Sequence, residues 1–211
     1  MNESLVVQRL PGQANELVLL FHGVGASAAD LVPLAHVVAQ VLPRAMVVSV
    51  DAAQASTLGR GREWFSVLGV TEQSRPARVE QAMPAFLNAI SHWQQESGVA
   101  PSGTTLVGFS QGAIMALEAT QMAQAPLPMA RIVAIAGRFA LPARRAPESV
   151  AYHLIHGETD AVMPAQHSIQ AAKELADLGA SVTLDLVPEL GHGIDARVGA
   201  LLRARLTKEG S

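Results

Sequence analysis

Residues 108–112 read Gly-Phe-Ser-Gln-Gly, a G-x-S-x-G pattern that can present Ser110 as a nucleophile. The apolar run TTLV precedes this pattern and the helix-forming run AIMALEAT follows it, which predicts a sharp turn between a strand and a helix. Gly108 and Gly112 lack the Cβ atoms that would clash in such a turn. The pattern therefore indicates acyl transfer through the Ser110 hydroxyl.

A serine hydroxyl is a weak nucleophile at neutral pH and requires a general base beside it. Where this motif follows a strand, the catalytic residues occur in the chain order serine, acid, histidine. His192 is the predicted base, because it follows the last strand-like run and stands between two glycines in a loop. Three other histidines follow the serine but are less suitable as the base. His153 lies in a predicted strand, His167 lies in a predicted helix, and His156 precedes the acid.

Asp160 is the predicted acid, because it follows a strand-like run and can approach the next loop, where His192 lies. Glu158 is the nearest alternative. Asp185 falls within a predicted strand and faces away, and Asp195 belongs to the start of the last helix. An acid in this position would fix the tautomer of the imidazole ring and stabilise its protonated form.

Acyl transfer also requires two N–H groups that stabilise the negative oxygen of the tetrahedral intermediate. The residue after the nucleophile, Gln111, supplies one in this motif, and a loop after an early strand supplies the other. Residues 21–25 (FHGVG) form that loop, with Val24 as the predicted donor and His22 as a residue that orders the loop by hydrogen bonding. A glycine-rich loop can also bind phosphate, but the Lys-Ser/Thr pair of a P-loop is missing here.

These residues need a sheet that brings loop ends together. Six apolar runs have the length and composition of strands buried on both faces: 17–21, 46–50, 104–109, 131–136, 150–155 and 182–187. Five longer segments predict helices: 29–41, 76–96, 112–123, 165–178 and 194–208. An additional strand at 4–9 would pair antiparallel at the edge.

This alternation predicts an α/β fold with a mostly parallel sheet covered by helices on both faces. Functional residues then lie at the carboxyl ends of the strands. The residues that end the apolar runs are His22, Asp51, Ser110, Gly137, His156 and Pro188.

The connector over residues 51–75 contains an aromatic pair, Trp64 and Phe65. These rings would either line an acyl pocket as substrate-binding residues or pack in the core under the loop, and the sequence leaves both interpretations open. No insertion is long enough for a large lid domain, which predicts a shallow, open pocket.

Composition limits the remaining possibilities. The 211 residues, 49% hydrophobic and 16% charged, suit a single globular domain over 1–211. The net charge of −3, without a basic face, gives no indication of nucleic-acid binding. The absence of cysteine excludes disulfides, cysteine-ligated zinc and a cysteine nucleophile.

The sequence also bears on location and partners. It has no apolar run near the ~18 residues of a membrane span and no signal-peptide pattern at its start, so we expect a cytoplasmic protein without a membrane partner. We expect no metal or organic cofactor. The oligomeric state stays open, a homodimer included.

Five segments, LVLLFHGVGAS, WFS, GFSQGAIMAL, HGETDAVMP and GHGID, together resemble the phospholipase/carboxylesterase family of α/β-hydrolases, which includes acyl-protein thioesterases and small bacterial carboxylesterases. The YpfH-type bacterial esterases are the most similar group within it. The resemblance spans nearly the whole chain and implies a lidless α/β-hydrolase with the triad and amide donors predicted above: Ser110, Asp160, His192, Val24 and Gln111. Two family patterns differ: HGxGD is HGVGAS here, and WFD is WFS, with Ser66 replacing the aspartate.

The sequence therefore predicts a serine carboxylesterase that hydrolyses short-chain acyl esters through an acyl-enzyme intermediate. One alternative is a thioesterase acting on acylated protein or an acyl carrier, which a comparison of oxygen and sulfur esters would distinguish. The other is a non-catalytic binding module with the same fold, which labelling of Ser110 by a fluorophosphonate probe would exclude.

Overall fold

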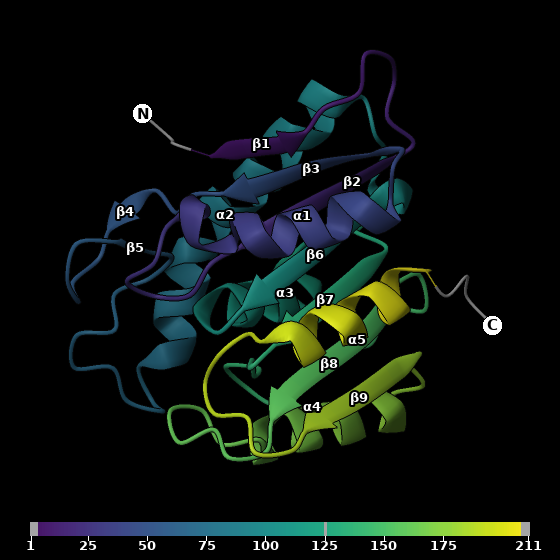
Figure 1. Ribbon diagram of the computed structural model, residues 1–211. Coiled ribbons are helices and arrows are strands. Elements are labelled where there is room, and N and C mark those ends of the chain that lie inside the picture. The colour runs from purple at the N-terminus through teal and green to yellow at the C-terminus, as the bar shows by residue number, and fades with distance from the viewer. Residues whose placement is uncertain (1–3, 125, 208–211) are drawn as a thin grey trace.

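Seven strands pair into one sheet, in the order β1-β3-β2-β6-β7-β8-β9 (Figure 1). The structure, a computed structural model, describes residues 4–124 and 126–207. The strands are β1 (Leu5–Gln8), β2 (Glu16–Phe21), β3 (Ala45–Val50), β6 (Thr104–Phe109), β7 (Arg131–Ile135), β8 (Ala151–Gly157) and β9 (Val182–Val187). All neighbouring pairs are parallel except β1 with β3, which confirms the predicted antiparallel edge strand.

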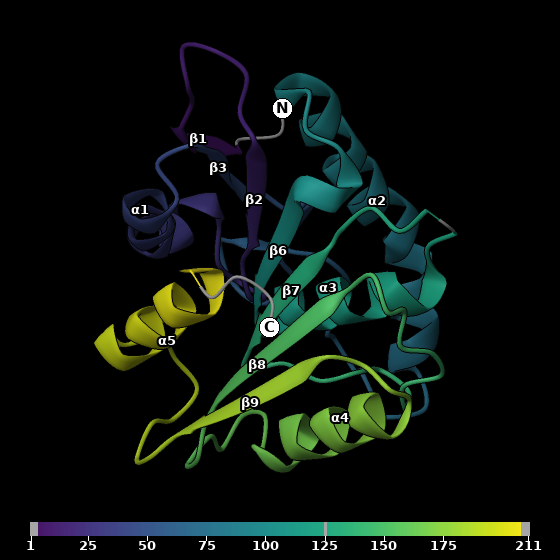
Figure 2. The ribbon, with the colours of Figure 1, turned by 90° about the vertical axis from the view of Figure 1, so that its right-hand side faces the viewer.

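Five α-helices cover this sheet: α1 (Val32–Val41), α2 (Arg75–Ser97), α3 (Gln111–Met122), α4 (Gln166–Asp177) and α5 (Ala196–Thr207). Short 3₁₀ turns, Ala28–Leu31 and Pro101–Gly103, precede α1 and β6. Figure 2 shows α1 and α5 on one face of the sheet and α2, α3 and α4 on the other. The predicted fold class is thus confirmed. None of the described helices is long and apolar enough to cross a membrane.

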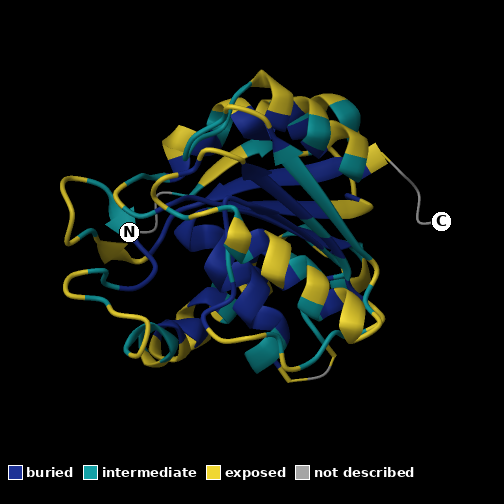
Figure 3. Cartoon of the chain, turned by 90° about the horizontal axis from the view of Figure 1, so that it is seen from below, coloured by how far each residue is buried: buried dark blue, intermediate teal, exposed yellow. Residues whose placement is uncertain are grey.

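The side chains of β2 show how the layers are held. Leu17, Leu19 and Phe21 belong to the core under α2, α3 and α4, whereas Val18 and Leu20 belong to the core under α1 and α5. All five are fully buried, because successive side chains of a strand point to opposite faces and both faces are covered. Figure 3 shows the buried sheet between helices whose outer surfaces are exposed.

The order in which strands are added to the sheet changes direction beside β2. From β2 the chain moves to β3 on one side, and later returns through β6 to build β7, β8 and β9 on the other. In register, Phe21 pairs with Val50 and with Gly108, so these three strands end at one level. Loops after β2 and β6 therefore meet at a topological switch point, the usual place for a site in such sheets.

Most element boundaries differ by one to three residues from the sequence predictions, and three of these differences involve residues named above or lie at the end of the described chain. β8 runs on to Gly157, so His156 lies inside a strand rather than beyond its end. β7 stops at Ile135, because Ala136 has a positive φ of 49° that ends the extended backbone. The final helix ends at Thr207 in the structure, and Lys208, the last residue predicted for it, lies outside the described residues.

The connector between β3 and α2, residues 51–74, contains only two short strands, β4 (Gln54–Ala55) and β5 (Arg62–Glu63), which pair with each other. In Figure 1 these strands lie beside the carboxyl ends of the sheet. The connector is too short for a separate lid domain, and it contributes Trp64 and Phe65 to this end of the molecule.

We expect Gly112→Ala to destabilise the fold by roughly 2–3 kcal/mol, as overpacking of a tight core contact does. A Cβ on Gly112 would lie 2.1 Å from the carbonyl oxygen of Phe21, so α3 could no longer approach β2. Gly12→Ala is the matched control: a Cβ there meets no atom within 4 Å, and its effect should stay within about 0.5 kcal/mol. Urea denaturation measures both, and equal midpoints would contradict the close approach.

Candidate active site

Ser110 occupies the turn between β6 and α3 with a φ of 52° and a ψ of −114°. A non-glycine residue with positive φ is strained, and the surrounding structure must hold it there. Its amide donates to the carbonyl oxygen of Ile135 at 2.9 Å, which ties the turn to the end of β7. A Cβ on Gly108 would lie 2.5 Å from the backbone of Ala113, so the turn requires glycine at this position.

A continuous chain of hydrogen bonds joins the three residues predicted as a triad. His192 Nε2 lies 2.9 Å from Ser110 Oγ, and His192 Nδ1 lies 2.7 Å from Asp160 Oδ2. The carboxylate can only accept, so Nδ1 carries the proton and Nε2 is free to accept from the serine hydroxyl. This is the arrangement in which a histidine can remove the proton of a serine.

Two loops that are distant in sequence meet to form this arrangement. Asp160 follows β8, and His192 lies between β9 and α5. The Glu158 amide donates to Val187, and the Thr159 amide donates to Leu190, each at 3.0 Å. A side chain at Gly157 would clash with the Leu190 carbonyl oxygen at 2.3 Å. Glycine at the end of β8 thus allows the acid and histidine loops to touch.

The carboxylate of Asp160 is buried but well supplied with donors. Oδ1 accepts from the amides of Val162 at 2.9 Å and Met163 at 2.8 Å. Burial acts to raise the pKa of Asp160, but the Met163 amide and the His192 ring outweigh it and hold the pKa below its usual value. Asp160 is therefore ionised at neutral pH.

The rejected candidates lie elsewhere. Asp185 pairs with Arg205 at 2.6 Å, and Asp195 binds Arg197 at the start of α5. Glu158 is exposed. His153 contacts Thr183 on β9, and His167 contacts Arg138. His156 is fully buried beside Asp160, with its Nε2 3.3 Å from Oδ2.

The loop after β2 lies directly against the serine. A Cβ on Gly23 would be 3.2 Å from the Cβ of Ser110, so only glycine allows this distance without displacement. Within the described part of the chain, the backbone amides of Val24 and Gln111 have no hydrogen-bond partner. Both predicted donors are therefore free in a region where the chain approaches Ser110.

His22 orders this loop through both ring nitrogens. Nε2 accepts from the Ala52 amide at 3.1 Å, so the ring proton is on Nδ1, which donates to the Gly23 carbonyl oxygen at 2.7 Å. Burial lowers the pKa of His22, which keeps this neutral form. Arg62 adds two backbone hydrogen bonds to Gly25 and Ala26. The loop is thus held in place by hydrogen bonds of the protein itself.

The side chain of Gln111, a contact that the sequence did not reveal, holds the aromatic pair. Its Oε1 accepts from the Trp64 amide at 2.7 Å, and its Nε2 donates to the Phe65 carbonyl oxygen at 2.6 Å. The Trp64 ring packs edge-on against Phe21, and its N–H donates to the carbonyl oxygen of His22 at 2.9 Å. The Trp64 ring therefore packs in the core, as one of the two interpretations predicted.

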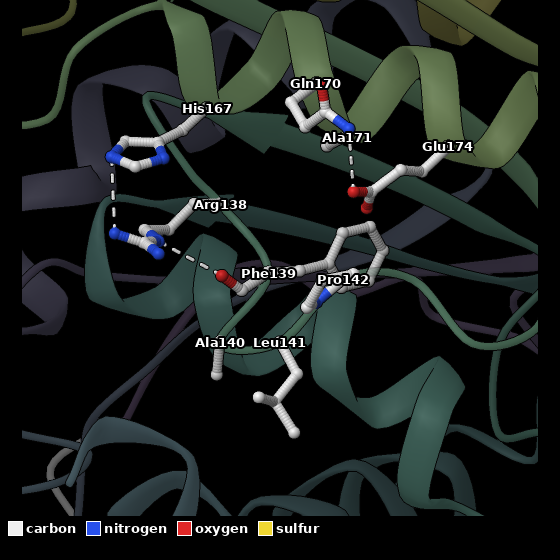
Figure 4. Close-up of a pocket in the computed structure, with 9 residues that line it drawn as sticks. All are labelled: Arg138, Phe139, Ala140, Leu141, Pro142, His167, Gln170, Ala171 and Glu174. Atoms are coloured by element: carbon white, nitrogen blue, oxygen red, sulfur yellow. Dashed lines mark hydrogen bonds between the residues drawn. The ribbon is translucent and has the colours of Figure 1, made fainter. Parts of the chain in front are cut away.

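Three cavities are lined by residues discussed above. One, of about 370 Å³, lies between the connector and α2 and is lined by Phe65, Ser66 and Leu68 among others. A second, of about 100 Å³, lies between the same elements and is lined by Trp64 and Phe86 among others. The third, of about 120 Å³, lies between α4 and the loop after β7, with Arg138 and His167 at one end (Figure 4). None of the three triad candidates lines any of them. Among the described residues, no group of three potential ligands is placed to hold a metal ion.

The comparisons with known proteins agree with one another. The sequence profile of the phospholipase/carboxylesterase family matches residues 2–204. Esterase YpfH of Escherichia coli (strain K12) is 42% identical over 196 residues, which cover 93% of this chain and 84% of that protein.

Two solved structures have similar folds. The crystal structure of esterase PE8 has a TM-score of 0.85 and 30% identity, covering 97% of this chain and 96% of the other. A carboxylesterase from Mesorhizobium loti, at 19% identity, has the same fold with a TM-score of 0.79, covering 99% of this chain and 94% of its own. The chain therefore belongs to the phospholipase/carboxylesterase family and is a serine hydrolase of the carboxylesterase class.

Proposed function

We propose that this protein hydrolyses short-chain carboxylic esters through an acyl-enzyme intermediate on Ser110. The observation that supports this most strongly is the unbroken hydrogen-bond chain from Asp160 through His192 to Ser110. The strained backbone of Ser110 and the two free amides beside it add to the case. An intact chain of this kind gives no support to a non-catalytic binding module.

In the first half-reaction, Ser110 Oγ attacks the ester carbonyl carbon while His192 Nε2 takes the hydroxyl proton. The carbonyl oxygen becomes negative, and the amides of Val24 and Gln111 stabilise it. The carbon–oxygen bond to the alcohol then breaks, and His192 returns the proton to the departing alcohol. Asp160 keeps the ring oriented and stabilises its protonated form throughout.

In the second half-reaction, water attacks the acyl group that is bound to Ser110. His192 takes a proton from this water and later gives it to Ser110 Oγ, which restores the free enzyme and releases the acid. No step requires a group from outside the protein other than water.

We assign the acyl group to the cavity between the connector and α2. Its wall includes Phe65, whose carbonyl oxygen is held by the side chain of Gln111, the neighbour of the nucleophile. Leu68, on the same wall, is 68% exposed, so the cavity opens toward solvent. An open cavity of this kind suits short acyl groups. Trp64, packed beneath, supports the wall through its backbone.

Ser110→Ala should reduce the hydrolysis of p-nitrophenyl butyrate by at least about 10³-fold, because the nucleophile is removed. The melting temperature should not fall, since the substitution deletes one hydroxyl. Ser91→Ala on the exposed surface of α2 is the matched control and should retain full activity. Equal activity of Ser110→Ala and the wild type would reject the proposed function.

Parallel assays with oxygen and sulfur esters of one acyl chain distinguish an esterase from a thioesterase.

On the acid side of the pH profile, activity should depend on one proton. The pKa of Asp160 is lowered, so its carboxylate stays ionised as the pH falls. A plot of log kcat/KM against pH should therefore have a slope of one on its acid side. A slope of two would mean that Asp160 also gains a proton there, contrary to its hydrogen bonding.

Leu68→Trp tests the acyl cavity without disturbing the core, because Leu68 is exposed. The larger ring should fill the opening and reduce kcat/KM for p-nitrophenyl octanoate by about tenfold, with little change for the acetate. Leu178→Trp, an exposed leucine at the end of α4, is the control. Unchanged chain-length preference in Leu68→Trp would place the acyl group elsewhere.

A further inference from the structure

His156 is a buried titratable residue that the proposed mechanism does not use. Its side chain is 0% exposed, as is that of Asp160, and its Nε2 lies 3.3 Å from Asp160 Oδ2. This is the same carboxylate oxygen that accepts from His192 Nδ1 at 2.7 Å. Two histidines therefore approach one oxygen of the acid, one from β8 and one from the loop before α5.

The remaining contacts of His156 fix where its proton lies. Nε2 is 2.7 Å from the Met163 carbonyl oxygen, which can only accept, so Nε2 carries a proton. Nδ1 is 2.7 Å from Ser168 Oγ, and this is the shorter contact of that hydroxyl, whose other partner is the Gly137 carbonyl oxygen at 3.2 Å. In the neutral ring the hydroxyl donates its proton to Nδ1. Burial lowers the pKa of His156, which favours this neutral ring with its single proton on Nε2.

This N–H group closes a ring of contacts around the acid. Met163 donates its amide to Asp160 Oδ1 at 2.8 Å and accepts from His156 with its carbonyl oxygen. His156 thus holds the loop 160–163 that curls around the carboxylate through its hydrogen bond to Met163, and the same Nε2 lies 3.3 Å from Oδ2. Ser168 on α4 anchors the other side of the imidazole.

We propose that His156 is a positioning residue for the acid: through its Nε2–H it fixes the rotation of the Asp160 carboxylate that directs Oδ2 at His192. The inference rests on the proposed function of Ser110, His192 and Asp160. His156 touches neither the nucleophile nor the reacting atoms. Its effect therefore passes entirely through Asp160, and this gives the proposal a distinctive test.

The chain offers a matched pair of substitutions. Glutamine at 156 places an amide N–H near the position of Nε2, whereas asparagine places it near Nδ1 and leaves the Met163 carbonyl oxygen without its donor. We expect His156→Asn to lower kcat about tenfold, the effect of leaving one buried acceptor unpaired beside the acid, with KM within about twofold. His156→Gln should recover most of the loss.

His153→Asn is the control for a histidine of the same strand. His153 contacts Thr183 on β9 and lies outside the triad, so its replacement should leave kcat unchanged. Melting temperatures of all variants identify any that fail to fold. If His156→Asn does not fold, Ser168→Ala takes its place, because it removes the partner of Nδ1 and should lower kcat about threefold.

A double-mutant cycle with Asp160→Asn separates positioning from a general structural role. If His156 acts through the carboxylate, His156→Asn should cause no further loss once Asp160→Asn is present. The same tenfold loss in both backgrounds would overturn the proposal, and so would full activity of His156→Asn alone. Ser110→Ala is assayed alongside as a control. If Ser110→Ala is inactive and His156→Asn is fully active, only the role of His156 is rejected. If Ser110→Ala is active, the proposed function itself is rejected.

Discussion

The close approach of α3 to the end of β2 is the constraint on which the rest of the site depends. At Gly112 a side chain would overlap the carbonyl oxygen of Phe21, the last residue of β2. Without that approach, the loop after β2 could not lie against Ser110, where a Cβ on Gly23 would be 3.2 Å from the serine Cβ. A glycine on the helix thus sets the position of both Ser110 and the loop beside it.

The strand order explains why these two loops meet. β2 and β6 are neighbours in the sheet but are separated in the chain by α1, β3 and α2. The chain leaves β2 in one direction and continues from β6 in the other, so no crossover helix covers the point between their carboxyl ends. The loops after β8 and β9 then supply Asp160 and His192 from the far side of β7.

Rigidity is the common property of the residues around the reacting serine. His22 and Arg62 hold the loop that carries Val24, and the side chain of Gln111 holds the aromatic connector. The acid receives donors on both carboxylate oxygens. Such fixed groups stabilise developing charge without having to reorganise during the reaction, which is the main source of electrostatic catalysis in enzymes.

Much of the fold and the candidate site could be predicted from the sequence alone, because the signals are local. Apolar runs of strand length, separated by helical segments, predicted the sheet and its covered faces. The G-x-S-x-G pattern singled out Ser110, and chain order then selected Asp160 and His192 from several acids and histidines. Each of these steps depends on neighbouring residues or on order along the chain.

Only the tertiary structure decided the contacts between residues that are far apart in sequence. The Gln111 side chain meets the Trp64 backbone across 47 positions, and the Trp64 ring packs against Phe21 in the core. The spacing of His156 and Asp160 is visible in the sequence, yet their contact exists only because residues 160–163 fold back over the strand end. Side-chain packing fixes such contacts, and no local pattern encodes them.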